Sequence, residues 1–172
     1  MSDARWIETD DDFVNAVDHF SKATELFARG GFDAPGLDGY AARMAFLHSM
    51  QSAHTSLESG LNRILAILGE ERPVGDSWHE DLIRRISREI QGKRPAIFDA
   101  ETARFADETR RFRHIAAKSY NNFRPQEAVE AVAAAHALTA RIVPAFIRFR
   151  AVIDPPEGNG GGSEGQVTGR SQ

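Results

Sequence analysis

Apolar residues along most of this chain recur every three or four positions and almost never alternate, which is the spacing typical of amphipathic helices. The longest such run, Tyr40–Leu68, predicts the longest helix of the protein. An earlier run predicts a helix that begins after Thr9, whose hydroxyl can cap it, and ends at Gly30 and Gly31. Gly60 interrupts the long run, so we expect a neighbouring helix to approach closely there.

Two shorter helices are predicted in the middle of the chain. Ser77 and Glu80 form a capping-box pattern at the start of the segment WHEDLIRRISREI. Asp99 is placed to cap the next helix, which leads into an arginine-rich segment. The apolar residues of that helix are expected to point into the core; they are Phe105, Phe112 and Ile115.

A last helix is predicted from Pro125 to about Ile153, with a kink at Pro144. These elements indicate an all-α fold, an antiparallel bundle of four to five helices spanning residues 10–153. Residues 1–9 are expected to be flexible, and the Gly-rich segment 154–172 cannot bury a core and is expected to be disordered. Bundles of this size often cover a wide apolar stripe by dimerising, so we expect a homodimer.

Composition narrows the class of protein. The 172 residues suit one domain, and the absence of cysteine excludes disulfides, thiolate metal sites and a cysteine nucleophile. No run approaches the roughly 20 apolar residues of a membrane span, and the first residues are acidic, unlike a secretory signal, so we expect a cytoplasmic protein with no membrane partner.

The net charge is −4, yet Arg84–Arg124 holds eleven Lys or Arg against five Asp or Glu. That asymmetry favours either a basic face that attracts phosphate or a solvated face of mixed charge.

The segment RRFRHIAAKSYNNF at the end of the fourth predicted helix concentrates groups that suit a phosphodiester. Arginine offers a planar fork of donors to phosphate oxygens, and histidine can move protons near neutral pH. Cleavage of RNA without a metal needs a proton acceptor, a proton donor and stabilisation of charge on the phosphate. Helical spacing places Arg110, His114 and Lys118 on one stripe, and Arg113 and Tyr120 on an adjacent one.

Other polar residues have simpler interpretations. No HExxH or comparable ligand pattern occurs, so we expect neither a metal nor another cofactor. Glu58, on the long helix, either faces the arginines of the fourth helix as part of a site or forms an ion pair that fixes helix register. His79 follows Trp78 at a helix start, where the indole is expected to anchor the loop.

Four segments, SLESGLNRILAIL, ERPVGDSWHEDLIRRI, the loop GKRP, and RRFRHIAAKSYNNFRPQE, together resemble the HepT-like branch of the HEPN superfamily over roughly residues 40 to 150. The resemblance implies an all-α homodimer whose two R-x4-H motifs meet in a cleft between the subunits. It also implies a metal-independent RNase that acts as the toxin of a toxin–antitoxin or phage-defence module. The expected partners are RNA and an MntA-type nucleotidyltransferase antitoxin, which silences such toxins by transferring AMP to a tyrosine.

Carried onto this sequence, the resemblance assigns the motif arginine to Arg113 and the AMP-accepting tyrosine to Tyr120, with Glu58 as a supporting acidic residue. Arg110 and Arg111 remain candidates for RNA binding. The motif histidine falls on Lys118, which departs from the family pattern. Lysine is a poor base unless its pKa is depressed, so the departure bears on activity rather than on fold.

Three outcomes are open at this position: Lys118 replaces the histidine, His114 acts one helical turn earlier, or the site is inactive. The corresponding functions are an RNase toxin, or an inactive HEPN dimer that binds RNA or an antitoxin without cleavage. A third function is a substrate-binding helical subunit for a nucleotidyltransferase, in which Tyr120 is purely structural.

Overall fold

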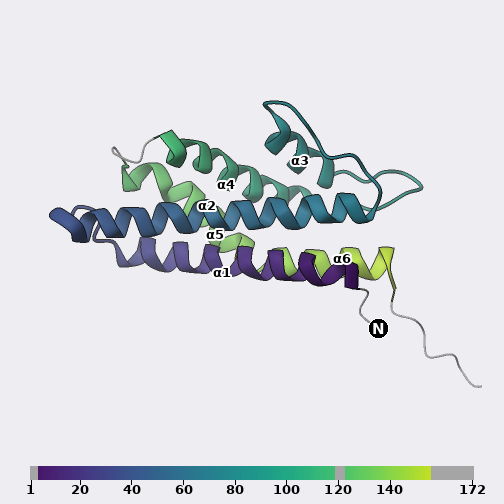
Figure 1. The fold of residues 1–172 in the computed structure, drawn as a ribbon, viewed down its shortest axis with the longest axis horizontal. Coiled ribbons are helices and arrows are strands. Elements are labelled where there is room, and N and C mark those ends of the chain that lie inside the picture. Colours follow the sequence, from purple (N-terminus) through teal and green to yellow (C-terminus); the bar gives the residue numbers. More distant parts are fainter. Residues whose placement is uncertain (1–3, 119–122, 156–172) are drawn as a thin grey trace, which may run out of the picture.

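The computed structural model describes residues 4–118 and 123–155, except for the side chain of Lys118. These residues form α-helices joined by loops, with two short 3-10 helices and one isolated bridge between Ile90 and Arg94 (Figure 1). The predicted all-α fold is confirmed. The elements are η1 (Ala4–Trp6), α1 (Ile7–Arg29), α2 (Gly36–Ile67), α3 (Trp78–Ile86), α4 (Ala100–Lys118), η2 (Pro125–Ala128), α5 (Val129–Thr139) and α6 (Ile142–Ile153).

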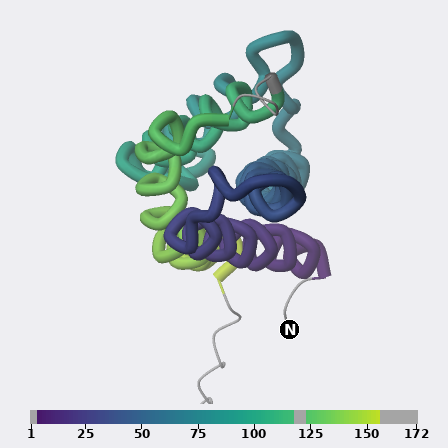
Figure 2. The backbone as a smooth tube through the Cα atoms, turned by 90° about the vertical axis from the view of Figure 1, so that its left-hand side faces the viewer, coloured from purple at the N-terminus to yellow at the C-terminus, as the bar shows by residue number. Residues whose placement is uncertain are grey.

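The long helices of the bundle surround one core. Helix α1 packs on α2 and α5, while α4 packs on α2 and α5 from the other side, so these elements enclose the core in the end-on view of Figure 2. Buried phenylalanines fill this space: the rings of Phe13 and Phe146 lie 5.0 Å apart, and those of Phe46 and Phe112 lie 5.8 Å apart. Helix α3 is an addition to this ring and packs against α2 and α4.

Helices α1 and α2 approach closely at Gly60, as the sequence predicts. A Cβ atom at this position would lie 2.7 Å from Cε1 of Phe13, closer than carbon atoms approach in folded proteins. The Phe13 ring is completely buried and fills the space that a side chain at position 60 would take. The glycine is therefore required by packing rather than by backbone conformation.

The start of α1 differs from the prediction. The helix begins at Ile7, and no side chain caps it, so Thr9 lies within the first turn instead of preceding it. Trp6 is fully buried, and its indole nitrogen donates a 2.9 Å hydrogen bond to Asp154 Oδ2, just after α6. Tertiary packing thus orders residues ahead of the predicted cap. Residues 1–3 and the tail from 156 onward lie outside the described part of the chain.

Helix α3 begins at Trp78, as predicted, but it is shorter than predicted and lacks the expected side-chain cap. The Ser77 hydroxyl hydrogen-bonds to the Asp81 carboxylate at 3.0 Å instead of capping a backbone amide, so the capping box is not formed. The helix ends at Ile86, whose carbonyl oxygen accepts a hydrogen bond of 2.8 Å from the Ile97 amide. The residues between Ile86 and Ile97 leave the helix and form a loop.

Arg94 holds that loop against the bundle. Its side chain is only 1% exposed, and its Nε donates to Glu70 Oε1 at 2.5 Å, while Nη2 lies 3.1 Å from Glu70 Oε2. The same guanidinium also donates to the carbonyl oxygens of Arg88, Pro95 and Arg85. A buried guanidinium with all of these partners connects the end of α2 to the end of α3.

Helix α4 begins as predicted and differs near its end. Asp99 Oδ1 accepts a 2.7 Å hydrogen bond from the Thr102 amide, which confirms the predicted cap. Phe112 points into the core and Phe105 is half-buried. Ile115, which was expected to point inward, is 40% exposed, because Ala116 takes the core-facing position on that turn.

The predicted last helix is divided into two. Pro144 is the third residue of α6, and the break lies at Ala140 and Arg141, between α5 and α6. A proline ring clashes with the carbonyl group four residues earlier, which here belongs to Ala140, so the interruption precedes the proline. The segments Pro125–Thr139 and Ile142–Ile153 are bent by 46°. Within the described chain, no single helix has the length and apolar character to cross a membrane, and this bent pair meets the criteria only when its two halves are combined.

Candidate functional site

Glu58 occupies the centre of a polar cluster on a helix that is otherwise mostly apolar on this face. It lies on α2 and is 4% exposed. Its Oε1 is hydrogen-bonded to Nε2 of His54, 3.0 Å away on the same helix, and to Nδ1 of His79 on α3. Its Oε2 lies 3.9 Å from Nη1 of Arg113 on α4. One buried carboxylate therefore faces two imidazoles and a guanidinium from three helices.

The ionisation of Glu58 follows from these neighbours. Burial favours the neutral carboxyl group, but the hydrogen bonds and positive charge of His54, and then of His79, favour the carboxylate more strongly. The pKa of Glu58 therefore lies below its ordinary value of 4.5. The carboxylate is charged at neutral pH and acts as a hydrogen-bond acceptor for both rings.

His54 connects this carboxylate to α4. Its ring is completely buried, and its Nδ1 lies 3.2 Å from the hydroxyl oxygen of Thr109. The Thr109 hydroxyl in turn lies 2.9 Å from the Ala106 carbonyl oxygen, to which it donates. Both nitrogens of the buried imidazole thus have partners, as buried polar groups require.

His79 lies between the carboxylate and the arginine. Its ring stacks on the indole of Trp78, with the ring centroids 3.6 Å apart. Nη1 of Arg113 lies 3.1 Å from Nε2 and 3.3 Å from Nδ1 of His79, so the guanidinium lies across the ring instead of along one lone pair. The side chain of His79 is 25% exposed and that of Arg113 is 29% exposed. On their buried sides both groups face the Glu58 carboxylate, and on their other sides both are exposed to solvent.

The exposed sides of these groups open into a cavity of about 210 Å³ between α2, α3 and α4. Arg110 is positioned at this cavity by a 2.7 Å hydrogen bond from its Nε to Asp107 Oδ1. The cavity thus combines two guanidinium groups with two imidazoles. Its lining residues are Gln51, His79, Arg110, Arg113, His114 and Ala117.

The structure brings together some of the predicted site residues and separates others. Arg110, Arg113 and His114 share the cavity, and Glu58 faces Arg113, which is one of the two arrangements expected for it from the sequence. Arg111 does not line the cavity; its side chain is 64% exposed and lies 2.9 Å from Asp107. Tyr120 and the side chain of Lys118 lie outside the described residues.

Sequence reasoning missed His79, and it assigned no role at the site to His54. His54 could have been found, because it precedes Glu58 by four residues on one helical face. For His79 the sequence offers no signal, since its contact with Glu58 depends on how α3 docks on α2. Among the described residues, no group of three His, Cys, Asp or Glu side chains is placed to hold a metal ion.

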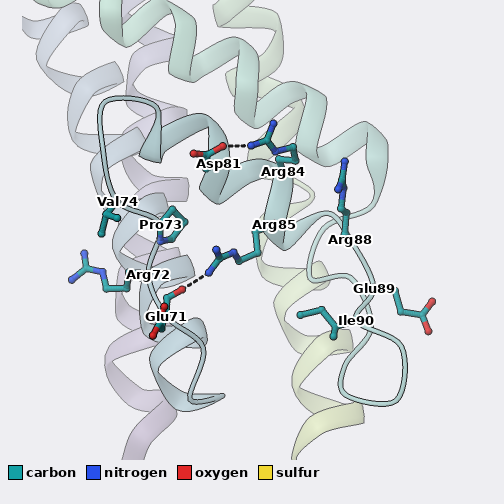
Figure 3. A pocket seen from close by; sticks show the side chains of 10 residues that line it. All are labelled: Glu71, Arg72, Pro73, Val74, Asp81, Arg84, Arg85, Arg88, Glu89 and Ile90. Atoms are coloured by element: carbon teal, nitrogen blue, oxygen red, sulfur yellow. Dashed lines mark hydrogen bonds and ion pairs between the residues drawn. The ribbon is translucent and has the colours of Figure 1, made fainter.

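A second and larger cavity, of about 580 Å³, lies beside α3 and the loop that precedes it (Figure 3). Arg84 is paired with Asp81, and Arg85 donates to the carbonyl oxygen of Glu71. Figure 3 shows Glu89 directed away from Arg88, and the lining holds four arginines against three acidic residues. The full lining is Glu71, Arg72, Pro73, Val74, Asp81, Arg84, Arg85, Arg88, Glu89 and Ile90. We call this the basic cavity.

Comparison with known proteins identifies the family of this chain. The sequence profile of a family described as HepT-like protein matches residues 45–153, more than half of the chain. The chain belongs to the HepT-like family. The matched region contains every residue that lines the cavity at Arg113 as well as Glu58 and His54. Searches of curated proteins and of solved structures found no significant match.

Proposed function

We propose that this HepT-like protein is a metal-independent RNA endonuclease of the HEPN superfamily that acts as the toxin of a toxin–antitoxin or phage-defence module. The observation that carries the proposal is the placement of Arg113. Its guanidinium is held from behind by Glu58 and His79 and opens into a cavity shared with Arg110 and His114. A fixed guanidinium of this kind suits the charge that develops on phosphate oxygens during cleavage.

The basic cavity supports the same proposal. It offers arginines on α3, the helix that carries His79, and on the loops beside it. Arginine side chains contribute to RNA binding mainly through the phosphates, without regard to base sequence. RNA backbone, rather than a small anion, is the ligand that a row of such groups suits.

Dimerisation is part of the proposal. Ile115 is exposed on α4, two residues after Arg113, on a helix whose other apolar residues are mostly buried. A second copy of the chain packed over this face would cover Ile115. Arg113 lies on another side of α4, and it is the family resemblance that implies a groove shared by its two copies. Sedimentation analysis of the purified protein should then give twice the mass of one chain, and a monomer at micromolar concentration would count against this element.

The direct test is RNA cleavage in the presence of EDTA. The protein should cut RNA and leave 2′,3′-cyclic phosphate ends, and Arg113→Ala should abolish cutting. Arg104→Ala is the matched control, because Arg104 lies on the same helix with its guanidinium 4.6 Å from the ring of Phe105, away from the cavity. Intact RNA after prolonged incubation of several RNAs with wild-type protein would contradict the proposal.

The second candidate function is an inactive HEPN dimer that binds RNA or an antitoxin without cleavage. The lysine at position 118, where the family motif has histidine, favours this function. It predicts RNA binding without turnover, and gain of cleavage in Lys118→His.

We further propose a nucleotidyltransferase as the antitoxin, with Tyr120 as acceptor of AMP from ATP and pyrophosphate as the leaving group. Co-expression with the enzyme encoded beside this protein, followed by mass spectrometry, tests this step. An AMP adduct on the peptide that contains Tyr120 would support it. Adduct-free protein in the presence of an active partner enzyme would favour the helical-subunit alternative, in which Tyr120 is structural.

A further inference from the structure

We propose that His79 is the general base of the reaction, in place of the histidine that the family motif carries at position 118; this inference rests on the proposed ribonuclease function. A base for RNA cleavage must present a lone pair next to the group that holds the phosphate. His79 does so, because its Nε2 lies 3.1 Å from Nη1 of Arg113 at the edge of the same cavity.

Glu58 gives this histidine a defined orientation. The buried carboxylate accepts a hydrogen bond from Nδ1–H of His79, which leaves the lone pair on Nε2. Trp78 stacks on one face of the ring, which favours this orientation. A carboxylate that orients an imidazole beside a reacting group is an arrangement that recurs on unrelated folds. Here the carboxylate itself is held by His54.

The other titratable groups at the cavity are less suited to the task. His114 lines the same cavity but is exposed, and within the described residues no hydrogen bond or ion pair holds its ring. A lysine amine at position 118 would be protonated at neutral pH unless its surroundings were strongly perturbed. Of the two histidines described at this cavity, His79 is the one that combines a fixed ring with contact to Arg113.

The step balances without a metal or any reactant except water. Phosphate oxygens of the bound RNA replace the imidazole as the partner of Arg113, which frees Nε2 of His79. Nε2 then takes the proton of the 2′-hydroxyl, O2′ bonds to phosphorus, and the bond from phosphorus to O5′ breaks. O5′ takes a proton from water, and His79 returns its proton to solvent. The products are a 2′,3′-cyclic phosphate and a 5′-hydroxyl.

The pH dependence reflects all charged groups around the ring. Glu58, on α2, places a carboxylate against the ring, and Arg113, on α4, places a guanidinium against it. Arg110, also on α4, adds positive charge across the cavity, and His114 is a further titratable group there. A base must be neutral to act, so the cleavage rate should rise with pH along an acidic limb that belongs to His79.

The decisive variant is His79→Asn. The asparagine amide stands near the place of Nδ1, so it can still donate to Glu58 and keep α3 docked, but it has no group at the position of Nε2 that could take a proton. We expect kcat to fall roughly 100-fold or more, with KM little changed and the acidic limb lost. His136→Asn, an exposed histidine on α5, is the matched control and should behave as wild type.

Three outcomes separate this inference from the proposed function. Cleavage by wild type, loss in Arg113→Ala and loss of the acidic limb in His79→Asn support both. If wild type cleaves RNA and His79→Asn keeps the same rate and acidic limb, the role of His79 is overturned but the ribonuclease function is not. The same holds if the acidic limb is lost in His114→Asn instead. Absence of cleavage by wild type overturns both. If the role of His79 were purely structural, His79→Asn would lower the melting temperature and raise KM, but the acidic limb of the pH profile would remain. That result too would overturn the role of His79 as base.

Discussion

The contact between Gly60 and Phe13 gives a prediction in which helix propensity and packing have opposite signs. Replacing a glycine by alanine inside a helix ordinarily stabilises a protein by about 1 kcal/mol. At position 60, however, the new Cβ would lie 2.7 Å from Cε1 and 3.0 Å from Cδ1 and Cζ of Phe13. That ring is fully buried and packs at 5.0 Å on Phe146, so it has no free space to move into.

Overpacking a well-filled core costs about 1–3 kcal/mol, and so short a contact with a completely buried ring places the cost in the upper part of that range, about 2–3 kcal/mol. We therefore expect Gly60→Ala to lower the free energy of unfolding by about 1–2 kcal/mol, equivalent to a fall in Tm of roughly 2–8 °C. Urea unfolding followed by circular dichroism measures the first quantity, and calorimetry measures the second.

Two further variants make the interpretation specific. Thr55→Ala, on the exposed side of α2, changes helix propensity without the contact and should be neutral or slightly stabilising. Phe13→Leu should cost stability in the wild-type background but much less in Gly60→Ala, because the smaller side chain leaves room for the new methyl group. If Gly60→Ala were as stable as wild type, the close approach of α1 and α2 would not be a constraint.

Three other predictions concern the charged groups. Because the pKa of Glu58 is lowered, its contribution to stability is complete above pH 4.5 and is lost as the pH falls through the lowered value. Urea midpoints measured from about pH 3 to pH 7 should therefore fall less steeply on the acid side in Glu58→Gln than in wild type, and identical slopes would refute the assignment. Asp99→Ala removes the cap on the Thr102 amide and should cost about 1 kcal/mol in urea unfolding, whereas Asp99→Asn should keep most of it. Arg88→Ala should reduce the slope of log Kd against log salt for RNA binding by about 1, and an unchanged slope would mean that RNA does not contact the basic cavity.

The sequence was sufficient for features that depend on neighbours along the chain. The end of α1 at Gly30 and the start of α4 after Asp99 were correctly predicted. A glycine after a helix and an aspartate before one act on the nearest backbone groups. The close approach at Gly60 was predictable because a glycine within an apolar helical stripe leaves space that a neighbouring helix can fill.

Features that depend on tertiary packing were not predictable in the same way. The early start of α1 requires the burial of Trp6 against α6, and the exposure of Ile115 depends on which residue of its turn meets the core. The division at Ala140 was anticipated as a kink at Pro144, but its position follows from the clash four residues earlier. For the site, Arg113 could be found from its motif, whereas His79 required the docking of α3.

The buried Arg94 affects how firmly the whole of α3 is held, and not only the loop in which it lies. Together with the hydrogen bond between His79 and Glu58, it fastens α3 to the bundle at both ends. The entropy of ordering α3 is thus lost when the chain folds and need not be lost again when a substrate arrives. A substitution at Arg94 that leaves the bundle folded should therefore give α3 more freedom to move. It should weaken the proposed RNA cleavage, because the ring of His79, which Arg94 does not contact, would be held less firmly in place.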